Sequence, residues 1–123
     1  AYGTERIPRV DKIVGPGNRW VATAKALVSA DCAIDFFAGP TEIVVVAEGG
    51  HADWWAADLI AQAEHDPDAR SIFITWNRRF AERVVASVTK KARGRDLVQQ
   101  SLAAHGYAIV AASPADAMAL SNR

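Results

Sequence analysis

The 123-residue sequence is 50% hydrophobic, which is enough apolar material for one ordinary folded domain and excludes a disordered chain. Its 14 basic and 14 acidic side chains cancel, so no overall field attracts a polynucleotide or an anionic membrane, and we expect neither as a partner. No apolar run approaches the roughly 18 residues of a membrane span. The single cysteine, Cys32, fits a reducing cytoplasm.

The first predicted elements surround a glycine-rich turn. Residues 10–14 are largely apolar and follow Pro8, which indicates a short strand. The turn Gly15-Pro16-Gly17-Asn18 comes next, and residues 19–30 then show helical spacing, with Asn18 placed to cap the helix. The apolar face of this helix is predicted to comprise Trp20, Ala24, Leu27 and Val28, with Lys25 elsewhere.

This turn has the features of an anion site. Its two glycines permit positive φ and close approach of a ligand, and the positive end of the following helix favours phosphate or pyrophosphate. The alternative is a loop that only connects strand and helix. The dinucleotide-binding fingerprint is not met, because its third glycine is replaced by Trp20. Asp35 stands at the distance of an acidic ribose contact, but without that glycine it receives no role.

The rest of the chain alternates strands with helices. Helical connections of ten or more residues force parallel crossovers, so we predict an α/β fold, a Rossmann-like parallel sheet with flanking helices. Ligands in such sheets gather at the carboxyl ends of the strands, where we expect both Gly-Pro corners. The predicted elements are an extended lead over 31–41, strands at 43–47, 71–75 and 107–111, and helices at 52–65, after Asn77, at 96–105 and from Pro114.

The helix at 52–65 carries the second candidate site. Asp58, Gln62 and His65 are spaced four and three apart, so they form a polar stripe on one side of the helix, whereas Glu64 points elsewhere. A histidine on such a stripe can bind zinc, although glutamine is an uncommon ligand. The alternative is a surface glutamine beside a histidine that complements the helix dipole.

Three segments together point to a family. Residues 10–18, residues 38–42 and residues 58–65, in this order and spacing, resemble histidinol dehydrogenase. The resemblance spans essentially the whole chain but only a central piece of that two-domain enzyme, so we expect a fragment. It implies that residues 1–47 are the C-terminal half of one Rossmann-like domain, on the NAD side. Residues 48–123 would be the first part of a second, on the zinc and substrate side.

The resemblance also implies a function and a set of site residues. Enzymes of this family use NAD and zinc to oxidise the small molecule histidinol to histidine through the aldehyde, in cytoplasmic histidine biosynthesis, and the full-length enzyme is expected to be a homodimer. By motif, Asn18 matches a residue at the NAD site, and Gln62 and His65 match zinc ligands that also contact substrate. Thr41 stands where the family usually has a substrate-contacting serine.

No catalytic residue is assigned within this chain. The family's glutamate-histidine acid/base pair and its other zinc ligands match positions beyond Arg123, so we do not expect residues 1–123 alone to turn over histidinol. Three alternatives stay open, and one of them is that the chain is only a structural fragment without a function of its own. Related NAD-dependent dehydrogenases of a sulfonated diol often carry threonine at the position of Thr41. A non-catalytic α/β module could instead use the Gly15–Asn18 turn to hold a phosphate or nucleotide.

Overall fold

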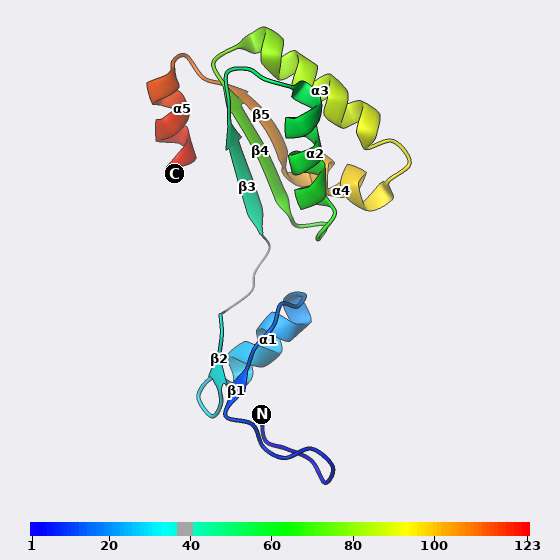
Figure 1. The fold of residues 1–123 in the computed structure, drawn as a ribbon, viewed down its shortest axis with the longest axis vertical. Coiled ribbons are helices and arrows are strands. Elements are labelled where there is room, and N and C mark those ends of the chain that lie inside the picture. The colour runs from blue at the N-terminus through cyan, green and yellow to red at the C-terminus, as the bar shows by residue number, and fades with distance from the viewer. Residues whose placement is uncertain (37–40) are drawn as a thin grey trace. The chain divides into compact units, whose positions relative to one another are not determined.

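The computed structural model describes residues 1–36 and 41–123, in two compact units, Ala1–Pro40 and Thr41–Arg123 (Figure 1). The second Gly-Pro corner, at residues 38–40, lies outside the described residues. The boundary between the two units, after Pro40, therefore falls a few residues before the predicted division at residue 47. That division concerns the domains of a longer enzyme, and it stays a prediction.

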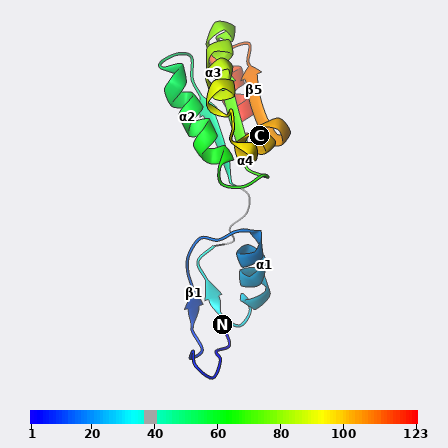
Figure 2. The same cartoon turned by 90° about the vertical axis from the view of Figure 1, so that its right-hand side faces the viewer.

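The first unit contains one helix and two very short strands. Strand β1 (Lys12–Ile13) leads through the glycine-rich turn into helix α1 (Arg19–Val28), and β2 (Ala33–Ile34) then pairs parallel with β1. Figure 2 shows α1 running alongside the two strands. The strand predicted at 10–14 is thus shorter than expected, and the extended lead contains a strand that the sequence did not reveal.

The predicted apolar face of α1 is wrong. The side chains of Trp20 and Leu27 are 70% and 76% exposed, whereas Lys25 is 3% exposed and is the buried residue of this helix. Helical periodicity identifies which side chains share a face, but it does not identify what lies against that face. Here a carboxylate partner, Asp35, compensates the buried ammonium of Lys25.

The second unit is a parallel three-stranded sheet with strand order β3-β4-β5. Helices α2, α3 and α4 cover one face and α5 covers the other (Figures 1 and 2). The parallel α/β prediction is therefore confirmed. The elements are β3 (Glu42–Val46), α2 (Ala52–Ala63), β4 (Arg70–Thr75), α3 (Arg78–Lys91), α4 (Asp96–His105), β5 (Gly106–Val110) and α5 (Pro114–Ser121).

Alternation along the strands builds a core on each face of this sheet. Val45 and Phe73 pack with residues of α2 and α3, and Phe73 meets Phe80 edge-on with ring centroids 5.8 Å apart. On the opposite face, Ile74 packs with Ala117 of α5. The uniformly apolar run of β3 is explained by this arrangement, because both faces of the sheet are covered by helices.

Side-chain caps begin two of these helices where the sequence placed them. Asn77 Oδ1 accepts from the backbone N–H of Phe80 at 3.1 Å, and Ser113 Oγ accepts from the N–H of Asp116 at 3.1 Å, with Pro114 in the first turn. These contacts satisfy N–H groups that a helix leaves unpaired at its start. Within the described ranges, no helix is long and apolar enough to cross a membrane.

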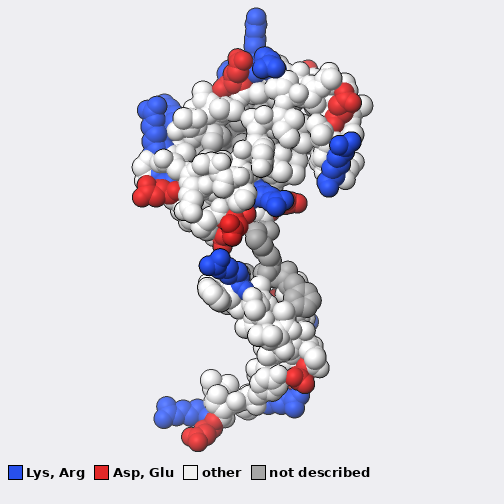
Figure 3. Space-filling view, turned by 180° about the vertical axis from the view of Figure 1, so that it is seen from behind, with Lys and Arg blue, Asp and Glu red and all other residues white. Residues whose placement is uncertain are grey.

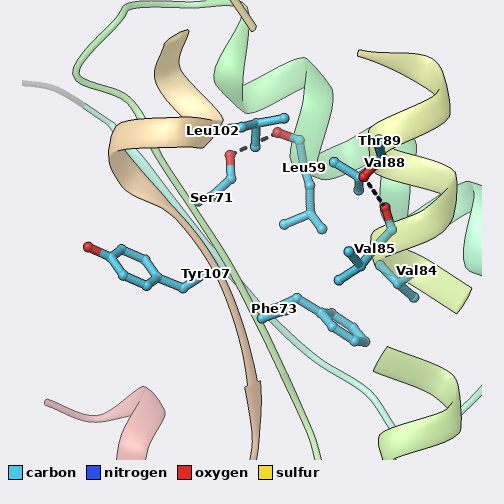
Figure 4. Close-up of a pocket in the computed structure, with 11 residues that line it drawn as sticks. Leu59, Ser71, Phe73, Val84, Val85, Val88, Thr89, Leu102 and Tyr107 are labelled. Atoms are coloured by element: carbon cyan, nitrogen blue, oxygen red, sulfur yellow. Dashed lines mark hydrogen bonds between the residues drawn. The ribbon is translucent and has the colours of Figure 1, made fainter. Parts of the chain in front are cut away.

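A cavity of about 230 Å³ lies between the sheet and the helices of its α2–α4 face. Figure 4 shows its mainly aliphatic and aromatic lining. Two of the three hydroxyl groups in the lining are already engaged, since Ser71 donates to Leu59 O at 2.8 Å and Thr89 donates to Val85 O at 2.9 Å, and the third belongs to Tyr107. None of the predicted site residues lines this cavity, so the candidate site lies elsewhere.

Candidate functional site

The turn at Gly15–Asn18 directly follows β1, as predicted, and its geometry requires both glycines. Gly15 has φ +128°, a conformation that residues with a Cβ rarely adopt. At Gly17 a Cβ would lie 2.5 Å from Cβ of Val21, closer than two carbon atoms that are not bonded to each other can approach. The turn is therefore a specific structure in which the backbone passes close to the first turn of α1.

Asn18 caps α1, which confirms the predicted cap. Its Oδ1 accepts from the backbone N–H of Trp20 at 3.1 Å and of Val21 at 3.3 Å. Because the oxygen is engaged, the amide nitrogen Nδ2 is the group that Asn18 can offer to a ligand, and the side chain is exposed. The first unit thus presents a hydrogen-bond donor at the start of a helix, a position that suits an anionic or carbonyl group.

Asp35 is bound to its own chain and is not a free ribose contact. Its Oδ2 accepts from the N–H of Gly15 at 2.7 Å, and its Oδ1 accepts from Lys25 Nζ at 2.6 Å. The Lys25 ammonium, and after it the Gly15 N–H, hold the pKa of Asp35 well below its usual range, so the carboxylate is ionised at neutral pH. Sequence reasoning missed Lys25, for which the only signal was a lysine among mainly apolar neighbours on the helix.

Thr41 and Gln62 lie together although 21 residues separate them in the sequence. Gln62 Nε2 donates to the backbone oxygen of Thr41 at 2.5 Å and to Thr41 Oγ1 at 2.6 Å. A backbone carbonyl can only accept, so this contact identifies the nitrogen side of the amide. Gln62 Oε1 therefore points away from Thr41, where it can bind another group.

His65 lies just past the C-terminus of α2 and is exposed. Its Nδ1 is 2.8 Å from the backbone oxygen of Ala61, one of the carbonyls left unpaired at the helix end. Because that oxygen can only accept, Nδ1 carries the proton, and the lone pair of the neutral ring is on Nε2. A backbone contact of this kind orients many metal-binding histidines. The same contact also complements the helix end.

These three residues lie at the amino edge of the sheet, whereas the corner that contains Thr41 was expected at the carboxyl edge. Thr41 immediately precedes β3, and its backbone oxygen also accepts from the N–H of Arg70, the first residue of β4, at 3.2 Å. The expectation of a carboxyl-end site is therefore wrong for Thr41. A segment before a strand lies at the amino end of that strand, and a crossover helix runs back to the same edge, which places Gln62 and His65 there as well.

Two acidic residues are close to this group in the sequence, Asp58 on α2 and Glu64 just past its end. Glu64 forms an ion pair with Arg95 and so points away from the stripe, as predicted. Asp58 is exposed. Across residues 1–36 and 41–123, no group of three or more histidine, cysteine, aspartate or glutamate side chains is close enough to hold a metal ion. The described residues therefore contain no complete cluster of this kind around His65.

Charged side chains on the second unit are mixed in sign. On the face seen in Figure 3, basic and acidic groups are interspersed over its surface, with uncharged areas between them. This face therefore shows no continuous basic stripe of the kind that tracks a phosphate backbone. The site residues predicted from the sequence lie instead at the Gly15–Asn18 turn and in the Thr41, Gln62 and His65 group.

Comparisons with known proteins give one consistent result. A family model described as histidinol dehydrogenase matches residues 1–123. The chain is 47% identical over 127 residues to a histidinol dehydrogenase of Pseudomonas aeruginosa and 49% identical over 127 residues to one of Geobacter metallireducens. These matches cover 100% of this chain but 29% of each relative.

A solved structure gives the same picture. A crystal structure of histidinol dehydrogenase from Elizabethkingia anophelis superimposes with a TM-score of 0.88 at 34% identity, over 98% of this chain and 29% of that one. The chain thus spans less than a third of the length of the proteins that it matches, and it has the fold of the corresponding part of them.

Proposed function

Because the chain belongs to the histidinol dehydrogenase family, we propose that it supplies part of the active site of a zinc- and NAD-dependent alcohol dehydrogenase that oxidises histidinol to histidine. The observation that carries the proposal is the paired orientation of Gln62 and His65. Each donates from its N–H side to a backbone oxygen, and the contacts among the described residues leave one acceptor without a partner, Oε1 in Gln62 and Nε2 in His65. Two neutral acceptors on one helix end suit a zinc ion.

The donor set fits zinc, but it is incomplete. Imidazole nitrogen is a common zinc ligand and amide oxygen a rare one, and a catalytic zinc keeps three protein ligands with an open position. Gln62 and His65 would therefore provide two ligands, and they also lie where the substrate would bind. Thr41 would hold the Gln62 amide with its Oγ1 and could contact the substrate from the same edge. When bound, zinc polarises an alcohol or carbonyl oxygen and NAD accepts hydride.

The turn of the first unit would provide the NAD contact. Asn18 Nδ2 is free to donate to the cofactor while its Oδ1 caps α1. Under this proposal, residues 1–47 belong to the NAD-side domain and residues 48–123 to the zinc and substrate side. No residue of this chain acts as the acid or base, and the full-length enzyme is a homodimer.

A chimera tests the proposal in a complete enzyme. This chain would replace the matching 127-residue stretch of the Pseudomonas aeruginosa relative, and zinc content and NAD affinity would be measured for two variants. We expect His65→Ala to lose zinc and turnover while NAD binding persists. Asn18→Ala should weaken NAD by about tenfold, the loss of one good contact, with zinc retained.

Matched controls separate ligand contacts from helix-end effects. His105→Ala removes another helix-end histidine, and Asn77→Ala removes another helix-capping asparagine, both away from the proposed site. A His65→Ala variant with full zinc content would refute the metal assignment. Assays of the chimera with histidinol and with a sulfonated diol compare the two substrates, and turnover of the diol alone would refute the histidinol proposal.

A further inference from the structure

The glycine-rich turn is attached to the rest of the first unit through the two peptide groups on either side of the Gly15 Cα. Lys25 Nζ donates to the backbone oxygen of Gly15 at 2.5 Å, and the backbone N–H of Gly15 donates to Asp35 Oδ2 at 2.7 Å. Lys25 and Asp35 also pair with each other at 2.6 Å. Both polar groups of Gly15 are thus bound by two side chains that neutralise one another.

The two side chains come from opposite sides of the turn. Lys25 projects from α1, which follows the turn, and Asp35 comes just after β2, the strand paired with β1. Asp35 Oδ1 also accepts from its neighbour Phe36 N–H at 2.8 Å, and Lys25 Nζ lies 5.2 Å from the centre of the Phe36 ring. The network therefore joins both strands and the helix at Gly15.

Neither charged group is available to a ligand. The Lys25 side chain is almost wholly buried, and its ammonium is shared between a carboxylate and a carbonyl. Both oxygens of Asp35 accept from the chain itself. A ligand-binding lysine or a ribose-binding aspartate would have to break these contacts first, at the cost of leaving a buried charge unpaired.

We propose that Lys25 and Asp35 are positioning residues of the NAD site, which hold the backbone N–H and C=O of Gly15 so that Asn18 faces the cofactor. The inference rests on the function proposed above. Between Gly15 and Asn18 there are two residues, one of them proline with a fixed φ, so a rotation at Gly15 is transmitted to Asn18. Loss of either side chain should move Asn18 without removing any atom that contacts the cofactor.

The test uses the same chimera and measures NAD affinity well below the unfolding temperature. Lys25→Met and Asp35→Asn should each weaken NAD by about tenfold or more, a change equal to one lost contact, with full zinc content. Exposed neighbours provide matched controls, Lys12→Met and Asp11→Asn, which should leave the affinity unchanged. Unchanged NAD affinity in folded Lys25→Met and Asp35→Asn variants would overturn the inference, since the pair would then serve stability alone.

Combination with Asn18→Ala shows how the pair acts. If Lys25 and Asp35 act through Asn18, adding either substitution to Asn18→Ala weakens NAD little further, because the contact has already gone. Fully additive losses would instead indicate direct contacts and would overturn the positioning role.

A second readout separates this inference from the proposed function. In the 123-residue chain, hydrogen exchange at the Gly15 amide should accelerate at least about tenfold in Asp35→Asn, because the weaker acceptor exposes the amide more often. If the unmodified chimera folds but does not bind NAD, the proposed function fails, while this exchange result still decides whether the pair holds the turn. Equal Gly15 exchange in both chains would refute the network itself.

Discussion

The two units of this chain differ in the interactions that stabilise each of them internally. In the second unit, strands β3 and β4 contribute apolar side chains to cores on both faces of the sheet, and the buried hydroxyls of Ser71 and Ser101 bond to backbone carbonyls. In the described part of the first unit, the buried residues are Cys32 and Lys25. A segment of about 40 residues cannot enclose a large core, so polar contacts decide its shape.

This difference matters for what each unit can do. An apolar core stabilises the second unit as a whole. Residues at the edge of that unit, such as Gln62 and His65, are held in place by the helix and sheet that this core stabilises. The first unit depends on a few hydrogen bonds at Gly15, so a single polar substitution can move its ligand-facing turn. We therefore expect apolar substitutions to act on stability in the second unit and polar or glycine substitutions to act on the turn in the first.

The largest expected effect is loss of a core aromatic in the second unit. Phe73 is 1% exposed and lies between α2 and α3, so Phe73→Ala should destabilise this unit by about 3–5 kcal/mol through lost burial and a residual cavity. Urea denaturation measures the change. The control is Tyr107→Ala on the adjacent strand, where the side chain is 54% exposed and the loss should be much smaller. Equal losses would contradict an apolar core centred on β4.

The next effect is a steric one in the turn of the first unit. Gly17→Ala would place a Cβ 2.5 Å from Cβ of Val21, which cannot move away without shifting α1. Such overpacking costs roughly 1–3 kcal/mol and should raise amide exchange throughout α1. Gly49→Ala is the matched control, since a Cβ there meets nothing within 4 Å. If exchange in α1 is as slow in Gly17→Ala as in the parent chain, the close approach in the turn is not as described.

The same contrast explains how much could be read from the sequence. The elements of the second unit were predicted to within a few residues, because long apolar stretches and caps such as Asn77 and Ser113 are local signals. On α2, apolar side chains at helical spacing, such as Leu59 and Ala63, are buried because a sheet lies against them. On α1 the same reasoning failed at Lys25, since what is buried there depends on a partner ten residues away in the chain.

The assignment of the site residues stays a prediction, but the local geometry of these residues can be compared with what the sequence indicated. The motifs identified Asn18, Gln62 and His65, and the capping role of Asn18 followed from its place before a helix. The contact between Gln62 and Thr41 joins residues from different elements, which spacing along one helix cannot reveal. Their location at the amino edge follows only once the sheet is parallel and the direction of α2 is known.

The smallest expected effect is a pH dependence confined to the first unit. The Lys25 ammonium and the Gly15 N–H lower the pKa of Asp35 in the folded chain. A carboxyl group with a depressed folded pKa contributes stability that is fully present above its ordinary pKa, about 4, and that is lost as the pH falls below it. Protonation of Asp35 removes the ionic partner of Lys25 and weakens the acceptor for the Gly15 N–H.

Protection of the Gly15 and Phe36 amides, corrected for the intrinsic pH dependence of exchange, should therefore fall between about pH 4 and pH 2. In Asp35→Asn this protection should already be low at neutral pH and should change little with acid, whereas Asp11→Asn should behave like the parent chain. Amides of β4 in the second unit provide an internal reference, because apolar packing and backbone pairing hold that strand. Suppose that acid lowers the amide protection of β4 and of Gly15 equally, in Asp35→Asn as well as in Asp11→Asn. This result would mean that acid unfolds the chain globally. The contrast between a polar first unit and an apolar second unit would then be wrong.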